Sequence, residues 1–163
     1  MHPPLRLAAG AAMLAMTCGC TQSPVVGESL GTIGYVRDRH PASTPATYLY
    51  TTASIADLTG LVDGLDAPDV AQRLHAVDPS THVVVALYFD ACAKSEPALA
   101  LNGGTLTVRY GAMLNRTCVR AADTLALFAV PRSQLPDPTV LEVCERRITL
   151  SGTEVSGDPI GLC

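Results

Sequence analysis

The chain of 163 residues has no tryptophan, few aromatic residues of any kind and a single lysine, Lys94. Charged residues make up 16% of the sequence, well below the roughly 25% of an average globular protein. The 11 basic residues are outnumbered by 15 acidic residues and form no basic stripe. Such a chain has little with which to neutralise phosphates, so its composition argues against a nucleic-acid partner.

The sequence also lacks the signatures of disorder and of repetition. Glycine and proline number 13 and 12, too few for a collagen-like or low-complexity chain, and there is no internal repeat. With 48% hydrophobic residues in 163 positions, the chain can bury one core but is short for two domains. We therefore expect one compact domain.

Motifs of the common enzyme classes are absent. The sequence has no nucleophile elbow, no His-Glu-x-x-His zinc motif, no P-loop and no Gly-rich dinucleotide turn. Its histidines are scattered and lack the spacing of metal ligands. We therefore predict no catalytic residue, no metal site and no cofactor. The competing hypothesis is a small extracytoplasmic hydrolase with a non-motif site built on His75 or His82.

Residues 1–19 have the pattern of an export signal. A weakly positive start that includes Arg6 precedes an apolar run from Leu7 to Met16. The run is about ten residues long, roughly half of what spans a bilayer, so a transmembrane helix is a poor interpretation. We interpret residues 1–19 as a signal peptide.

The end of this segment resembles the lipobox of bacterial lipoproteins, where the signal is cut before a cysteine that receives a diacylglycerol. Cys20 follows the small Gly19, whereas the competing Cys18 follows Thr17. Thr17 also stands where a lipobox usually has leucine. If Cys18 leaves and Cys20 carries lipid, four of the six cysteines remain, an even set for an oxidising compartment. Cys20 is therefore the predicted lipidation site, and an ordinary secretory signal is the alternative.

Lipidation at Cys20 predicts a protein tethered to the bacterial cell membrane on its extracytoplasmic side. Each buried CH₂ of an acyl chain contributes about 0.8 kcal/mol, so two or three chains hold a protein at a bilayer. Removal of residues 1–19 takes away Arg6 and no acid, which leaves a formal charge of −5. This charge favours neither anionic lipid nor nucleic acid, so we expect the lipid to supply the membrane contact.

Residues 20–46 are predicted to form the lipidated N-terminus and a linker, because they are rich in Ser, Thr, Gly and Pro. As a flexible coil, about 25 residues would reach roughly 25 to 30 Å from the membrane. In the alternative interpretation, Thr32–Arg37 forms an edge strand and half of this segment belongs to the domain.

The domain is predicted to span residues 47–163 and to begin with a helical hairpin. Ser54 and Asp57 have the spacing of a capping box, and Pro68 suits the first turn of a second helix that ends at Asp78. The apolar residues recur at helical spacing: Leu58, Leu61, Val62 and Leu65, then Val70, Leu74 and Val77.

After residue 80 the hydrophobic period changes to that of strands. The strand-like segments are His82–Asp90, Ala98–Leu101, Thr105–Tyr110, Thr124–Val130 and Val140–Leu150. The first and fourth are apolar on both faces, as central strands are, and Asn102-Gly103-Gly104 predicts a hairpin turn. We predict an α+β fold, a short helical hairpin followed by an antiparallel meander of about five strands.

The meander predicts how the four remaining cysteines pair. Cys92 follows one strand and Cys118 precedes another, with two strands between them, so both should lie at the same end of the sheet. We therefore pair Cys92 with Cys118, which leaves Cys144 to bind Cys163 and staple the C-terminal tail. Each such bridge typically stabilises a fold by about 2–4 kcal/mol.

The order of features from Thr51 to Pro136 resembles the C-terminal domain of the PrcB family. The resemblance is carried by Ser-Ile-Ala-Asp-Leu at 54–58, by Asp78 before the first strong strand, and by Leu-Phe-Ala-Val-Pro-Arg at 127–132. That family is named for a lipoprotein subunit associated with a bacterial surface protease complex. The resemblance implies an accessory or binding domain and no catalytic residue.

These observations together predict a membrane-anchored extracytoplasmic lipoprotein. We expect a binding or accessory module with an extracytoplasmic protein partner and without catalytic activity. A structural protein of the cell envelope is an alternative that the sequence alone does not separate from this one.

Overall fold

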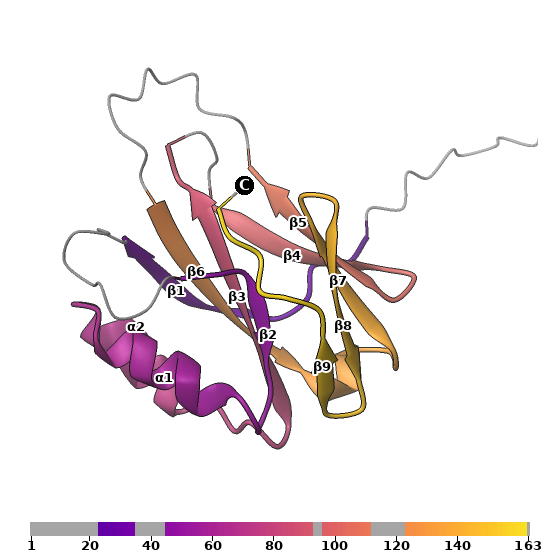
Figure 1. Cartoon of the computed structure of the whole chain (residues 1–163), viewed down its shortest axis with the longest axis horizontal. Helices are drawn as coiled ribbons and strands as arrows, with labels where there is room; N and C mark the ends of the chain where they lie inside the picture. Colours follow the sequence, from indigo (N-terminus) through magenta and orange to yellow (C-terminus); the bar gives the residue numbers. More distant parts are fainter. Residues whose placement is uncertain (1–22, 35–44, 93–95, 112–122, 163) are drawn as a thin grey trace, which may run out of the picture.

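The computed structural model describes residues 23–34, 45–92, 96–111 and 123–162 (Figure 1). This part of the chain forms nine β-strands and two α-helices. The elements are β1 (Glu28–Gly34), β2 (Tyr48–Tyr50), α1 (Ile55–Asp63), α2 (Pro68–His75), β3 (His82–Asp90), β4 (Pro97–Asn102), β5 (Thr105–Tyr110), β6 (Asp123–Pro131), a short 3-10 turn (Arg132–Gln134), β7 (Thr139–Val143), β8 (Arg146–Ser151) and β9 (Glu154–Ser156).

The strands form two sheets that pack face to face (Figure 1). The first sheet has the order β1-β6-β3-β2 and is antiparallel throughout. The second has the order β4-β5-β7-β8-β9 and is antiparallel except for the parallel pair β5 and β7. The helices cover the outer face of the first sheet, so the layers are helices, sheet and sheet.

The prediction of an α+β fold with antiparallel strands is confirmed, but the single meander is wrong. After the β4–β5 hairpin the chain returns to the first sheet as β6, and it crosses again to form β7–β9 in the second. The reason lies in β6, which is apolar on both faces and can be buried on both only in the middle of a layered structure.

Strands β3 and β6 lie at the centre of the first sheet, as their two-faced apolar sequences predicted. Residues 83–89 and 124–130 are all buried. Alternate residues point to opposite faces of a strand. One set therefore enters the core between the sheets, with Val85 and Phe128 as examples, and the other set enters the core beneath the helices, with Val84 and Leu127 as examples.

The predicted helical hairpin is confirmed. Leu58, Val62, Leu65, Val70 and Leu74 are buried against the first sheet. The predicted capping box is wrong, because the Ser54 side chain makes no cap hydrogen bond to its helix.

The predicted strand Val140–Leu150 is two strands joined by a tight turn. Cys144 and Glu145 both have positive φ, 51° and 63°, and the register pairs Val143 with Arg146 across them. Positive φ at both central residues matches the right-handed twist of a two-residue hairpin. Cys144 is therefore exposed at the turn and does not share a strand face with Ile148. The sequence hides this turn because it contains neither glycine nor asparagine.

The predicted linker of residues 20–46 is wrong for its middle part, because the N-terminal segment pairs with both sheets. Val26 N–H donates to Leu99 O at 3.0 Å and Leu101 N–H donates to Pro24 O at 3.1 Å, which places the segment along β4. The chain then turns at Gly27 and continues as β1 along β6. The alternative of an edge strand was closer to the structure, although the strand begins earlier than expected.

A second crossing links the sheets at their other edge. Thr47 N–H donates to Ile160 O at 2.7 Å, and Ile160 N–H donates to Thr47 O at 2.9 Å. Thr47 precedes β2 of the first sheet, and Ile160 follows β9 of the second. Backbone pairing thus joins the two sheets on both sides of the sandwich, while β1 remains an edge strand of the first sheet.

The predicted disulfide residues lie partly within the described residues. Cys92 follows β3, Cys144 lies in the β7–β8 turn, and both are disulfide-bonded. Cys118 and Cys163 lie outside the described residues, as do Cys18, Cys20 and the signal segment. The predicted pairing therefore stays a prediction.

We expect Gly27→Ala to destabilise the domain and Gly60→Ala to stabilise it. Gly27 has φ +80°, and an added Cβ would lie 2.8 Å from Val130 Cγ2 and 3.1 Å from Ala129 O. The strained φ and this contact together cost at least about 2 kcal/mol. Gly60 lies in α1 with nothing within 4 Å of the added Cβ. Alanine there adds about 0.5–1 kcal/mol of stability.

Urea unfolding of the two variants beside the original chain measures both free energies of unfolding. An unchanged or higher stability of Gly27→Ala would contradict the described crossing between the sheets.

Candidate functional site

A groove lies at the corner of the molecule where α2 and the turn after it meet the ends of β1, β3 and β6. Two adjoining hollows of about 370 and 270 Å³ share Glu28, His82 and Ala129 in their linings. We call the two hollows together the corner groove. Its lining residues are Val25, Gly27, Glu28, Leu30, Arg73, Ala76, Val77, Asp78, His82, Ala129, Pro131 and Gln134.

The sheet register places the polar residues of the corner groove. Glu28 on β1 lies opposite Ala129 on β6, and His82 on β3 lies opposite Pro131 on β6. Arg73 extends from α2 toward β1, where its Nη1 donates to Leu30 O at 3.5 Å. Three strands and one helix thus bring together side chains that are far apart in the sequence.

Asp78 lies in the turn between α2 and β3 and lines the groove as an anion. Its Oδ1 accepts hydrogen bonds from the Ser80 hydroxyl at 2.7 Å and from Ser80 N–H at 2.9 Å. These bonds, the hydroxyl first and the backbone N–H second, lower the pKa of Asp78 below its ordinary value of 3.8. This side-chain turn is the usual reason for aspartate before a chain reversal.

His82 begins β3 and is held by its neighbour. Its Nδ1 lies 2.9 Å from Thr81 Oγ1, and the same hydroxyl lies 3.3 Å from Asp78 O. A hydroxyl carries one hydrogen, so when Thr81 donates to the Asp78 carbonyl, His82 Nδ1–H donates to Thr81 Oγ1. In that tautomer Nε2 keeps its lone pair and can accept a hydrogen bond.

His75 belongs to a different surface from His82. Its Nε2 lies 3.0 Å from Asp63 Oδ1, with the two side chains 54% and 49% exposed. The pair lines a hollow of about 580 Å³ beside α1 and α2, and His82 is not part of that lining. The structure therefore does not bring the two predicted histidines into one site. Among the described residues, no group of three or more His, Cys, Asp or Glu could hold a metal ion.

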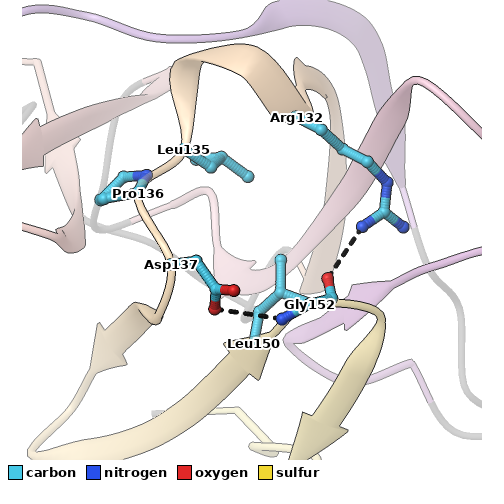
Figure 2. Close-up of a pocket in the computed structure, with 6 residues that line it drawn as sticks. All are labelled: Arg132, Leu135, Pro136, Asp137, Leu150 and Gly152. Carbon is cyan, nitrogen blue, oxygen red and sulfur yellow. Dashed lines mark hydrogen bonds between the residues drawn. The ribbon is translucent and has the colours of Figure 1, made fainter.

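A smaller pocket of about 150 Å³ lies between the loop after β6 and the β8–β9 turn (Figure 2). Figure 2 shows that Arg132 and Asp137 both reach Gly152. Arg132 Nη1 donates to Gly152 O at 3.1 Å, and Asp137 Oδ1 accepts from Gly152 N–H at 3.0 Å. Each of the two side chains thus forms a hydrogen bond with a backbone group of the β8–β9 turn. These bonds connect the loop after β6 to the second sheet.

Sequence reasoning missed most of these residues. Glu28 was assigned to the linker, Arg73 and Asp137 belong to no motif, and Arg132 was noted only as the end of the segment 127–132. A signal for Asp78 was present, because Asp-Pro-Ser typifies a turn that precedes a strand. Glu28 and Arg73 meet only through pairing of β1 with β6 and packing of α2, and Arg132 and Asp137 meet at Gly152 of the β8–β9 turn.

No protein-family model, curated protein or solved structure matches the chain. The resemblance to the PrcB family stays a prediction for that reason. Within the described part of the chain, no helix is long and apolar enough to cross a membrane.

We expect Ser80→Ala to raise the pKa of Asp78 toward 3.8, because the Ser80 hydroxyl is the largest cause of its lowered value. NMR titration of the Asp78 carboxyl in both proteins measures the change. Ser156→Ala, on β9 and away from this turn, is the matched control and should leave the titration where it was. An unchanged midpoint in Ser80→Ala would contradict the described turn.

Proposed function

We propose that the chain is a lipoprotein of the bacterial cell membrane, anchored through Cys20 and facing the extracytoplasmic side. The observation that carries this proposal is the disulfide-bonded state of Cys92 and Cys144. Disulfides persist in oxidising compartments and are rare in the cytosol, so they favour export. The export pattern of residues 1–19 and the lipobox-like Gly19–Cys20 agree with this inference.

We further propose the pairs Cys92–Cys118 and Cys144–Cys163. Cys144 and residues 160–162 line one surface hollow of about 320 Å³, so the chain approaches Cys144 just before Cys163. This proximity supports the second pair, and the first pair follows if the remaining two cysteines bond to each other. Each bridge would tie a turn or loop to the sandwich.

The anchored domain acts as a binding or accessory module, with the corner groove as its contact surface. The groove borders β1, the edge strand of the first sheet, whose outer backbone groups suit an extended segment of a partner protein. Its lining offers charges of both signs, with Glu28 and Asp78 opposite in sign to Arg73. These features favour a protein partner, and the resemblance to the PrcB family points the same way.

The first test concerns the anchor. When cells are fed a fatty acid with a clickable alkyne group, we expect the chain to incorporate the label. Cys20→Ser should abolish incorporation because it removes the acylated thiol and the cleavage site. Cys18→Ser is the matched control and should be labelled like the original chain. Labelling that survives in Cys20→Ser but disappears in Cys18→Ser would place the anchor at the other cysteine.

The second test concerns the partner. A photo-crosslinking amino acid at Gln134, an exposed residue of the corner groove, should capture a protein in intact cells. The same probe at Thr153 is the matched control, because this residue is exposed in the β8–β9 turn outside the groove. We expect an adduct of defined mass from position 134 that is several-fold weaker from position 153. Equal capture at both positions, or none at position 134, would contradict the groove as the contact surface.

A further inference from the structure

Very little chain separates the proposed lipidation site from the first residue that is held in a sheet. Pro24 accepts a hydrogen bond from Leu101 N–H, and Val25 pairs with Ala100 on β4. Pro24 is the fourth residue after Cys20. Four extended residues reach at most about 14 Å. The long flexible tether expected from composition is therefore replaced by a very short one.

We propose that the domain lies directly against the membrane that holds its anchor, with the region around Pro24 facing the lipid headgroups. This inference rests on the proposed lipidation of Cys20. We call this region the N-terminal end and define it by residues at the N-terminal segment, the β4–β5 turn and the loop before β7. Its members are Pro24, Val25, Asn102, Gly103, Pro136 and Pro138.

Backbone contacts hold the three parts of the N-terminal end together. Leu101, which pairs with Pro24, precedes the β4–β5 turn. Gly104 O in that turn accepts from Val140 N–H at 2.9 Å, and a Cβ on Gly104 would lie 3.7 Å from Pro136. The headgroups would therefore meet one continuous surface.

The composition of the N-terminal end suits a headgroup layer. Its six members carry no charge, and Val25 is 64% exposed, which is unusual for a large apolar side chain in the described part of the chain. The neighbouring Asp137 is charged, but its Oδ1 accepts a hydrogen bond from Gly152 N–H. The layer therefore meets the exposed apolar Val25 and uncharged residues, with the Asp137 carboxylate as a neighbouring charge.

The charge distribution favours the same orientation. Asp57, Asp63, Asp66 and Asp69 are exposed on the helical layer, which covers the outer face of the first sheet, whereas Pro24 and Val25 pair with β4 of the second sheet (Figure 1). Anionic headgroups repel such a surface over about a Debye length. The short tether and the acidic helices thus both direct the N-terminal end toward the membrane and α1 and α2 away from it.

Fluorescence quenching tests this orientation on the full lipidated chain in vesicles of phosphatidylethanolamine and phosphatidylglycerol. A fluorescent amino acid replaces Asn102 in one sample and Asp66 in its matched control, both exposed positions. With a spin label on the lipid headgroup, we expect several-fold stronger quenching at position 102. Equal quenching, or stronger quenching at position 66, would overturn the proposal.

A longer tether tests whether the short linker causes the proposed orientation of the domain. Insertion of about twenty Gly and Ser residues before Ser23 allows the domain to move away from the bilayer. We expect quenching at position 102 to fall to the level at position 66. Quenching at position 102 that is unchanged by the insertion would contradict the role of the tether.

Flotation of the vesicles distinguishes a wrong lipidation site from a wrong orientation of the domain. A chain that does not float with its vesicles contradicts lipidation at Cys20, and with it the proposed function. The orientation is then tested on a chain that begins at Cys20 and is coupled to a phospholipid through its amino terminus. In that chain the same two positions must show the same difference if the short tether orients the domain.

Discussion

The pairing of β3 with β6 is the interaction on which the rest of the structure depends. All nine residues of β3 have partners in β6, from His82 opposite Pro131 to Asp90 opposite Asp123. Both strands are buried on two faces. Their side chains therefore contribute to the core beneath the helices on one face and to the core between the sheets on the other. The helices, the second sheet and β1 each need this ladder to bury their apolar faces. The corner groove follows from it, because β6 separates Glu28 from His82.

The two chain crossings determine at which end of the sandwich the N-terminal segment begins. At one edge the N-terminal segment leaves β4 and joins β6, and at the other edge Ile160 joins the segment before β2. The first crossing brings the chain to its proposed anchor within a few residues, so the same backbone bonds that close an edge also determine which end of the domain meets the membrane. An accessory module built this way would present its corner groove beside the membrane and its acidic helices outward.

Much of the fold could be predicted because its strongest signals are local. The hydrophobic pattern alone predicts which residues are buried in β3 and β6. It does the same for the apolar stripe of the helices, which includes Leu58 and Leu74. The β7–β8 turn was missed because Cys144 and Glu145 adopt positive φ without the usual turn residues. Strand β1 was expected only as an alternative edge strand at Thr32–Arg37, because the first half of its Gly- and Ser-containing sequence carries no strand signal of its own. The groove was missed for the same reason, since its polar residues meet through pairing between distant segments.

Peptide mass spectrometry of the mature protein, digested without reduction, tests the central claim most directly. The account predicts an N-terminal peptide that begins with a diacylglyceryl Cys20, and two cross-linked peptides that join Cys92 to Cys118 and Cys144 to Cys163. An unmodified N-terminus, or a start at Cys18, would contradict the anchor. A peptide that joins Cys92 to Cys163 would leave the sandwich in place but contradict the proposed stapling of its C-terminal tail.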